Sequence, residues 1–141
     1  MSTPAAQVIS FGFRHAAPPD ADLVLDLQPW LRDPAAAAWC LLLTGRDDRV
    51  REHVLAIEGA AELLAHLEGA ARTLLRLAAG EQPVVVAVGC AGGRHRSVAL
   101  VEELADRLRA DWTVEVEHRH IERPILSPAR PGDRKRLPAT P

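Results

Sequence analysis

The chain has 141 residues, of which 48% are hydrophobic and 26% charged, and its net charge is −2 at pH 7. This size and composition predict one soluble globular domain, and the near-neutral charge gives no case for nucleic-acid binding through overall electrostatics. The two cysteines, Cys40 and Cys90, exclude a disulfide framework, and no apolar segment is long enough to span a membrane, so a cytoplasmic protein is expected.

The first third of the chain predicts two short strands. Residues 1–6 are expected to be a flexible leader. Gln7–Phe13 and Leu23–Leu27 are predicted strands because apolar residues dominate both. The link between them is too short for a helical crossover, so the two strands are either antiparallel or not neighbours.

The middle of the chain predicts helices. Residues 35–43 contain a run of alanines and are expected to be partly helical and largely buried. Residues 48–79 carry apolar side chains at helical spacing, and Gly59 is expected to divide them into two helices.

The last part of the folded region predicts a strand, a helix and a second strand. Residues 84–88 are continuously apolar, residues 97–109 have one apolar helical face, and residues 113–117 alternate as a half-exposed strand does. This order predicts a parallel βαβ unit, and hence an α/β fold with a small, mainly parallel sheet flanked by helices. The predicted domain covers residues 7–123. Residues 124–141 contain five prolines and a local charge of +3, and are expected to be disordered.

The segment between the apolar strand and the next helix predicts an anion site. Gly89–Ser97 contains three glycines in its first five residues and ends in Arg94, His95, Arg96 and Ser97. Glycines let the backbone turn tightly, and the first turn of a helix offers free N–H groups and partial positive charge. The loop is therefore predicted to bind a phosphate.

The ends of the neighbouring strands add further candidates. Ligands of open parallel sheets bind at the carboxyl ends of the strands. If the strands are parallel, Arg14 and His15 follow one of them at that edge, and His118, Arg119 and His120 follow another. We therefore expect cationic side chains from three segments to converge there.

A second interpretation of the loop is enzymatic. Cys90, Gly93, Arg96 and Ser97 fit the Cys-x-x-Gly-x-x-Arg-Ser/Thr signature of protein tyrosine phosphatases, in which a thiolate attacks phosphorus. Gly89 stands where those enzymes have His, and only Asp47 or Asp48 could act as the general acid. The competing interpretation is that Cys90 is a small buried residue, and that the chain has no catalytic residues.

Five blocks of the chain, in order, resemble the C-terminal domain of the RapZ family, the RNase adapter or YvcJ-like nucleotide-binding proteins. The loop block Gly89–Val98 resembles Gly-Cys-Thr-Gly-Gly-x-His-Arg-Ser-Val. The other blocks are Ser10–Arg14 (Ser-Phe-Gly-Phe-Lys), Asp20–Asp26 (Asp-Ala-Asp-x-Val-x-Asp), Thr44–Asp47 (Thr-Gly-x-Asp), and Val101–Ala105 with His118–Arg119.

The resemblance implies an α/β domain similar to a subdomain of phosphofructokinase, with an anion pocket at this loop. In relatives that pocket senses glucosamine-6-phosphate, and the domain contributes to RNA binding and oligomerisation. The implied ligand-binding residues are the loop Gly89, Cys90, Ala91, Gly92, Gly93, Arg94, His95, Arg96 and Ser97, with Arg14, His118 and Arg119 nearby.

The sequence also departs from the family pattern. Ala91 replaces a threonine, Gln28 replaces an arginine, and Asp33–Pro34 is the nearest match to an Asn-Pro-His segment. Nothing matches the Walker motif Gly-x-x-x-x-Gly-Lys-Ser/Thr, so ATP hydrolysis by this chain is not expected.

Three function classes follow from this sequence. The leading one is a non-catalytic module that binds a phosphosugar or nucleotide, with no cofactor and no metal, and regulates a partner protein. The second is an RNA-binding adapter, and the third is a Cys-dependent phosphatase using Cys90, Arg96 and Ser97. A homodimer is the expected assembly.

Overall fold

A computed structural model describes residues 3–32 and 38–124. Four strands form one sheet: β1 (Ala6–Gly12), β2 (Leu23–Asp26), β3 (Val84–Cys90) and β4 (Val114–His118). Their order is β2-β3-β1-β4, and every pairing is parallel. The predicted α/β class with a parallel sheet is therefore confirmed.

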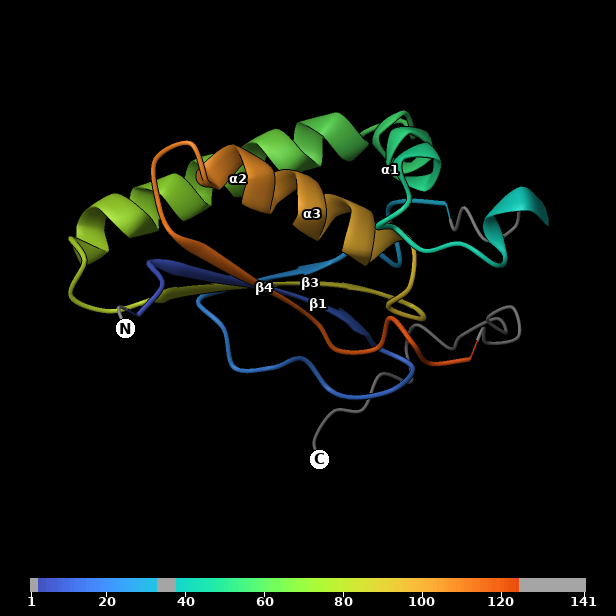
Figure 1. Cartoon of the computed structure of the whole chain (residues 1–141), viewed down its shortest axis with the longest axis horizontal. Helices are drawn as coiled ribbons and strands as arrows, with labels where there is room; N and C mark the ends of the chain where they lie inside the picture. Colours follow the sequence, from blue (N-terminus) through green and yellow to red (C-terminus); the bar gives the residue numbers. More distant parts are fainter. Residues whose placement is uncertain (1–2, 33–37, 125–141) are drawn as a thin grey trace.

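Three helices cover one face of this sheet (Figure 1). They are α1 (Asp48–Leu55), α2 (Ala60–Ala78) and α3 (Arg96–Leu108), and a short 3-10 turn, η2 (Ala38–Cys40), precedes them. The Asp47 carboxylate accepts a hydrogen bond from the Arg49 amide and so caps α1. Gly59 takes a left-handed conformation, φ 87°, between α1 and α2, which confirms the predicted division there.

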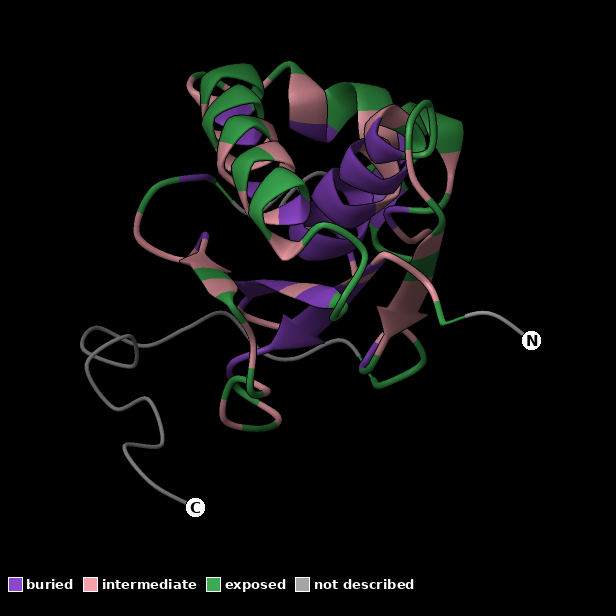
Figure 2. Cartoon of the chain, turned by 90° about the vertical axis from the view of Figure 1, so that its left-hand side faces the viewer, coloured by how far each residue is buried: buried purple, intermediate pink, exposed green. Residues whose placement is uncertain are grey.

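The two faces of the sheet are buried differently. On the helix side, strand residues such as Val8, Val86 and Val88 pack with α3, whose inner face is fully buried, into the main core (Figure 2). On the other side, Ile9, Phe11, Phe13 and Ala87 form a smaller cluster. The link between β1 and β2 runs across this second face (Figure 1).

Several boundaries differ from the predicted ones. β1 begins at Ala6, and the Ala5 amide donates to the Thr113 carbonyl, so the end of the expected leader 1–6 is part of the sheet. β1 and β2 are not neighbours, because β3 lies between them; of the two predicted alternatives, this is the one found. β3 and β4 are parallel, as expected, but β1 separates them.

The prediction for residues 35–43 is half right where the structure describes the segment. It is partly helical, because Ala38–Cys40 form η2, but it is not largely buried, because Leu41 and Leu42 are exposed, Leu42 by 88%. Consecutive apolar residues in an irregular segment cannot all face the core, and only Cys40 is fully buried. Residues 33–37 and most of the predicted tail, 125–141, lie outside the described residues.

Arginines and carboxylates join the three helices along their outer surfaces. Glu103 pairs with Arg51 at 2.7 Å and with Arg107 at 3.0 Å, and Arg107 also pairs with Glu68 at 3.2 Å. Burial alone would raise the pKa of Glu103, but the hydrogen bonds from Arg51 and Arg107 lower it below its usual range. No helix among the described residues has the length and apolarity to cross a membrane.

Candidate anion-binding site

The loop after β3 is a tight turn closed around the Cys90 sulfur. The Gly93 amide donates to Cys90 Sγ at 3.2 Å, and Ser97 Oγ lies 3.2 Å from the same sulfur. Gly93 takes φ 73°, which favours glycine. Cys90 belongs to the main core, so its thiol holds the turn from beneath.

Glycines allow three segments to meet at this turn. A Cβ atom on Gly12 would lie 2.5 Å from the Gly92 carbonyl carbon, and one on Gly45 would lie 2.4 Å from the His95 carbonyl oxygen. A Cβ atom on Gly89 would collide with the rings of Phe11 and Phe13. The backbones of the turns after β1 and before α1 therefore pack directly against the loop.

Two backbone amides of the loop just before α3 are available to a ligand. Among the described residues, no acceptor is bonded to the amides of Gly92 or Arg94. His95 is the N-cap of α3, and its side chain makes no capping hydrogen bond. Free N–H groups at a helix N-terminus favour negative charge, so this turn suits a phosphate or sulfate.

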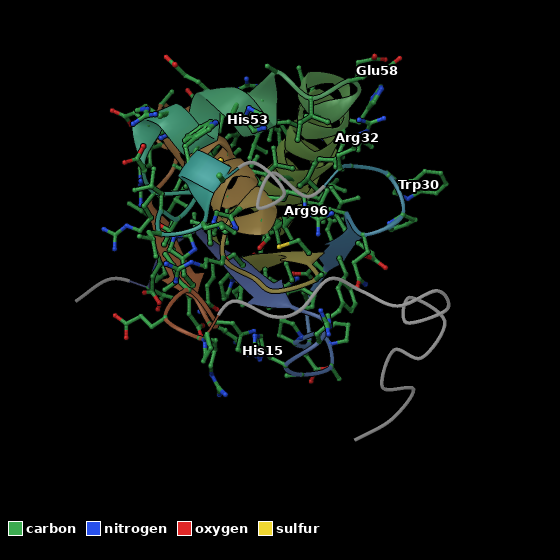
Figure 3. The ribbon with its side chains drawn as sticks, turned by 90° about the vertical axis from the view of Figure 1, so that its right-hand side faces the viewer. His15, Trp30, Arg32, His53, Glu58 and Arg96 are labelled. Carbon is green, nitrogen blue, oxygen red and sulfur yellow. The ribbon has the colours of Figure 1, made fainter. Side chains whose placement is uncertain are left out.

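Arg96 is the central side chain of the site. It is only 4% exposed, on the helix-covered side of the sheet (Figure 3). Its Nη1 donates to the Leu31 carbonyl at 2.8 Å, and its Nε is buried with no hydrogen-bond partner among the described residues. No described carboxylate pairs with it. A buried guanidinium that has only a carbonyl partner is costly unless an anion joins it.

The other two cations of the loop make contacts with the protein itself. His95 is buried and donates from Nε2 to the Cys40 carbonyl at 2.8 Å. Arg94 donates from Nη1 to the Ile121 carbonyl at 3.0 Å, which ties the loop to the turn after β4. Both side chains therefore fix the loop in place. Arg94 resembles Arg96 in that its Nε is buried without a described partner, but Arg96 is the more deeply buried of the two.

The structure places His118 and Arg119 away from Arg96. His118 Nδ1 lies 2.6 Å from Ser10 Oγ, and its Nε2 lies 2.7 Å from Glu102 Oε2 on α3. Both ring nitrogens are thus engaged, and the ring joins β1, β4 and α3. Arg119 pairs with Glu117 at 3.0 Å.

A second group of basic residues lies on the opposite face of the same sheet edge. His15 lies below the strands, on the side away from Arg96 (Figure 3). Its ring centroid is 5.0 Å from that of His120. Burial, Arg123 and Arg14 lower the pKa of His15, and burial, His15 and Arg123 lower that of His120. The expected convergence of three segments is therefore divided between two faces.

Two contacts of the site were not predicted from sequence. The carbonyls of Leu31 and Cys40, which hold Arg96 and His95, belong to the irregular segment after β2, and backbone carbonyls carry no sequence signature.

Trp30 is 70% exposed and projects away from the molecule (Figure 3). No group of three or more His, Cys, Asp or Glu within the described ranges could hold a metal ion.

Comparison with known proteins agrees with the blocks in the sequence. The family model of the RapZ C-terminal domain matches residues 4–122. The chain belongs to this family. It is 44% identical over 126 residues to a nucleotide-binding protein of Acidothermus cellulolyticus, covering 84% of this chain and 40% of that protein. A nucleotide-binding protein of Thermobifida fusca is also 44% identical, over 121 residues, with 84% of this chain and 41% of that protein covered. The chain thus spans about two fifths of the length of these relatives.

Proposed function

We propose that this RapZ C-terminal domain is a non-catalytic regulatory module that binds a phosphorylated small molecule at Gly89–Ser97. The observation that carries the proposal is Arg96, a buried cation at the N-terminus of α3 that has no described counter-ion. A phosphate at this position would accept hydrogen bonds from the loop amides and from the guanidinium together. Arginine suits this role because its fork of donors matches the geometry of phosphate oxygens.

The ligand we favour is a phosphosugar such as glucosamine-6-phosphate, or a nucleotide. The names of the relatives support a nucleotide, although they belong to proteins more than twice as long as the matched region. Ala91 offers no hydroxyl to the anion, and Gln28 is uncharged and bonds to Asp26, so the phosphate depends on Arg96 and the loop backbone. Specificity for the rest of the ligand would come from residues outside the loop.

A thermal-shift screen tests this proposal. The purified chain would be compared with Arg96→Ala in phosphate, sulfate, glucosamine-6-phosphate, other sugar phosphates and nucleotides. Binding to the native state alone raises the unfolding midpoint, and one phosphorylated compound should do so in the wild type but not in Arg96→Ala. Arg107→Ala is the matched control, because this arginine lies on the same helix in ion pairs with Glu103 and Glu68. No shift for any anion in the wild type would refute the proposal.

RNA binding is a second candidate, favoured by the arginines on the other face. Arg14, Arg119 and Arg123 follow β1 and β4 at one edge of the sheet, close enough to lower the pKa values of His15 or His120. If they bind phosphates of RNA, affinity should fall steeply with salt, and Arg123→Ala should reduce the slope of that dependence. Equal binding by the wild type and Arg123→Ala would argue against this candidate.

The phosphatase alternative depends on the thiol. Its supporting observation is the contact of Ser97 Oγ and the Gly93 amide with Cys90 Sγ, groups that would stabilise a thiolate. Hydrolysis of p-nitrophenyl phosphate that is lost in Cys90→Ser would establish it. Our leading proposal predicts no hydrolysis by either protein.

A regulated protein partner and a homodimer complete the proposal. Trp30 and Leu42 are large apolar side chains that project into solvent, and such residues are common in contacts between proteins. Light scattering of the wild type and Trp30→Ala would show whether the chain self-associates and whether Trp30 takes part.

A further inference from the structure

His120 makes an unusual hydrogen bond to the backbone beneath the loop. Its Nδ1 accepts the Gly12 amide proton at 2.8 Å, and the residue is only 6% exposed. Because the amide can only donate, Nδ1 must carry a lone pair, and the ring is neutral with its proton on Nε2. A second proton would place an N–H against the Gly12 N–H and break this bond.

The surroundings of His120 also oppose its protonation. His15 lies beside it from the link between β1 and β2, and Arg119 and Arg123 lie on its own segment. Arg94 reaches the same turn from the loop and bonds to the Ile121 carbonyl. Among the described groups that influence His120 electrostatically, all are cationic or become cationic on protonation. A charged His120 would therefore be repelled as well as unbonded.

Two contacts connect His120 to the anion loop. Gly12, the donor to His120, packs against Gly92 and Gly93 with no room for a Cβ atom. The two residues after it, Phe13 and Arg14, donate their amides to the carbonyls of Cys90 and Ala91. A displacement of Gly12 would therefore displace the loop backbone, and movement of the turn after β4 would release Arg94.

We propose that His120 is a proton-sensitive latch, which holds the loop in its anion-binding shape when neutral and releases it when protonated. This inference depends on the proposed function, because the loop must bind an anion for its affinity to change. Acidification is expected to weaken binding, although added positive charge by itself would strengthen it. On acidification, the latch thus predicts weaker anion binding, and simple charge attraction predicts stronger anion binding.

The test measures sulfate affinity by calorimetry between about pH 8 and about pH 5.5, where His titrates. Sulfate is the probe because, unlike phosphate, it keeps its charge over this range. The wild type should bind more weakly at the acidic end, and one unit of pKa difference between the free and bound protein sets an upper limit of about tenfold on this change. By reciprocity, sulfate should lower the pKa of His120 in an NMR titration of its ring.

The key variant is His120→Asn, whose side-chain oxygen can replace Nδ1 as the acceptor but does not titrate. It should bind sulfate as the wild type does at alkaline pH and lose the acid weakening. His66→Asn on α2 is the matched control and should keep the wild-type pH dependence. Affinity that rises on acidification, or an acid weakening that persists in His120→Asn, would overturn the latch.

A second measurement separates failure of the latch from failure of the proposed function. In the ligand-free wild type, the amide signals of Gly12, Gly92 and Gly93 should shift with the midpoint of the His120 ring. If sulfate does not bind at any pH, the proposed function fails, and this readout still decides whether the latch exists. Glycine signals that do not follow His120 would overturn it.

Discussion

The two ends of α3 carry arginines in opposite situations. Arg107, near the C-terminus, is more than a third exposed and pairs with Glu103 and Glu68, and a cation in the last turn also complements the helix dipole. Arg96, in the first turn, is buried, bonds to one carbonyl and adds its charge to the positive end of the dipole. The position of Arg107 therefore stabilises the fold, whereas the position of Arg96 does not.

This difference separates an arginine that is ion-paired within the fold from one that has no described counter-ion, and the second is the one we propose to bind a ligand. The chain uses arginine for all but one of its lysine and arginine positions, so the residue type alone carries no functional information. Burial and the presence or absence of a counter-ion do carry it. Substitutions at the loop end of α3 and at its ion-paired end should therefore have different effects on stability and on ligand binding.

The largest effect is expected where the loop end has no free space. Gly45→Ala would place a Cβ atom 2.4 Å from the Ala99 amide and from the His95 carbonyl oxygen, both backbone atoms. We expect it to destabilise the fold by about 3 kcal/mol, the upper range for overpacking. Gly69→Ala is the control, because a Cβ atom there meets nothing within 4 Å. Because Gly69 lies in the middle of α2, Gly69→Ala should stabilise the fold by about 0.5–1 kcal/mol. Urea unfolding measures both, and a neutral Gly45→Ala would contradict the packing described.

Arg96→Met should separate binding from stability. It removes the charge but keeps a long apolar side chain, so phosphate affinity should fall at least tenfold, or about 1.4 kcal/mol. Stability without a ligand should be unchanged or higher, because an unpaired buried charge is lost. A large loss of stability in phosphate-free buffer would show that Arg96 mainly supports the fold.

The pH dependence of stability should follow the two histidines. Their pKa values are lowered from the ordinary 6.5, so the folded state favours their neutral forms. Stability should be full above about pH 6.5 and decline as the pH falls below it, because the unfolded chain gains protons first. Urea midpoints at pH 7.5 and about 5.5 should converge in a His15→Gln/His120→Asn double variant. If the stability of that variant still declines with falling pH as in the wild type, other titratable groups cause the decline.

The smallest effect is expected at the ion-paired end. Glu103→Gln removes the shared partner of Arg51 and Arg107, and partly exposed pairs of this kind contribute about 0.5–1 kcal/mol. The loss should shrink in high salt, and phosphate affinity should not change. An effect on phosphate binding would show that the two ends of α3 are coupled.

The sequence was most informative where one physical pattern dominates. The continuous apolar run at 84–88 predicts a doubly covered strand, and the glycines after it predict a close-packed turn; the structure contains both. The helical spacing of apolar residues over 48–79 predicts α1 and α2 in the same way. These elements depend on local pattern, so local reasoning finds them.

The site was less predictable, because it depends on which face each side chain takes. His118 was expected near the anion loop. The alternation of Val114 and Val116, continued by two residues, places it on the side of β4 that faces α3, where the structure shows its contact with Glu102. The carbonyls of Leu31 and Cys40 belong to irregular backbone, and no pattern marks them. The division of the basic residues between two faces depends on side-chain contacts such as that of His15 with His120, which strand order alone does not determine.

The central claim, that Arg96 receives its counter-ion from a ligand, is tested most directly by NMR. Inorganic phosphate would be titrated into isotope-labelled protein while the arginine Nε–H signals and the loop amides are followed. We expect the signals of Arg96 Nε–H and of the amides of Gly92–Ser97 to shift together and saturate, while the signal of Arg107 Nε–H does not move. Saturation without movement of Arg96, or no saturable shift in the loop, would contradict it.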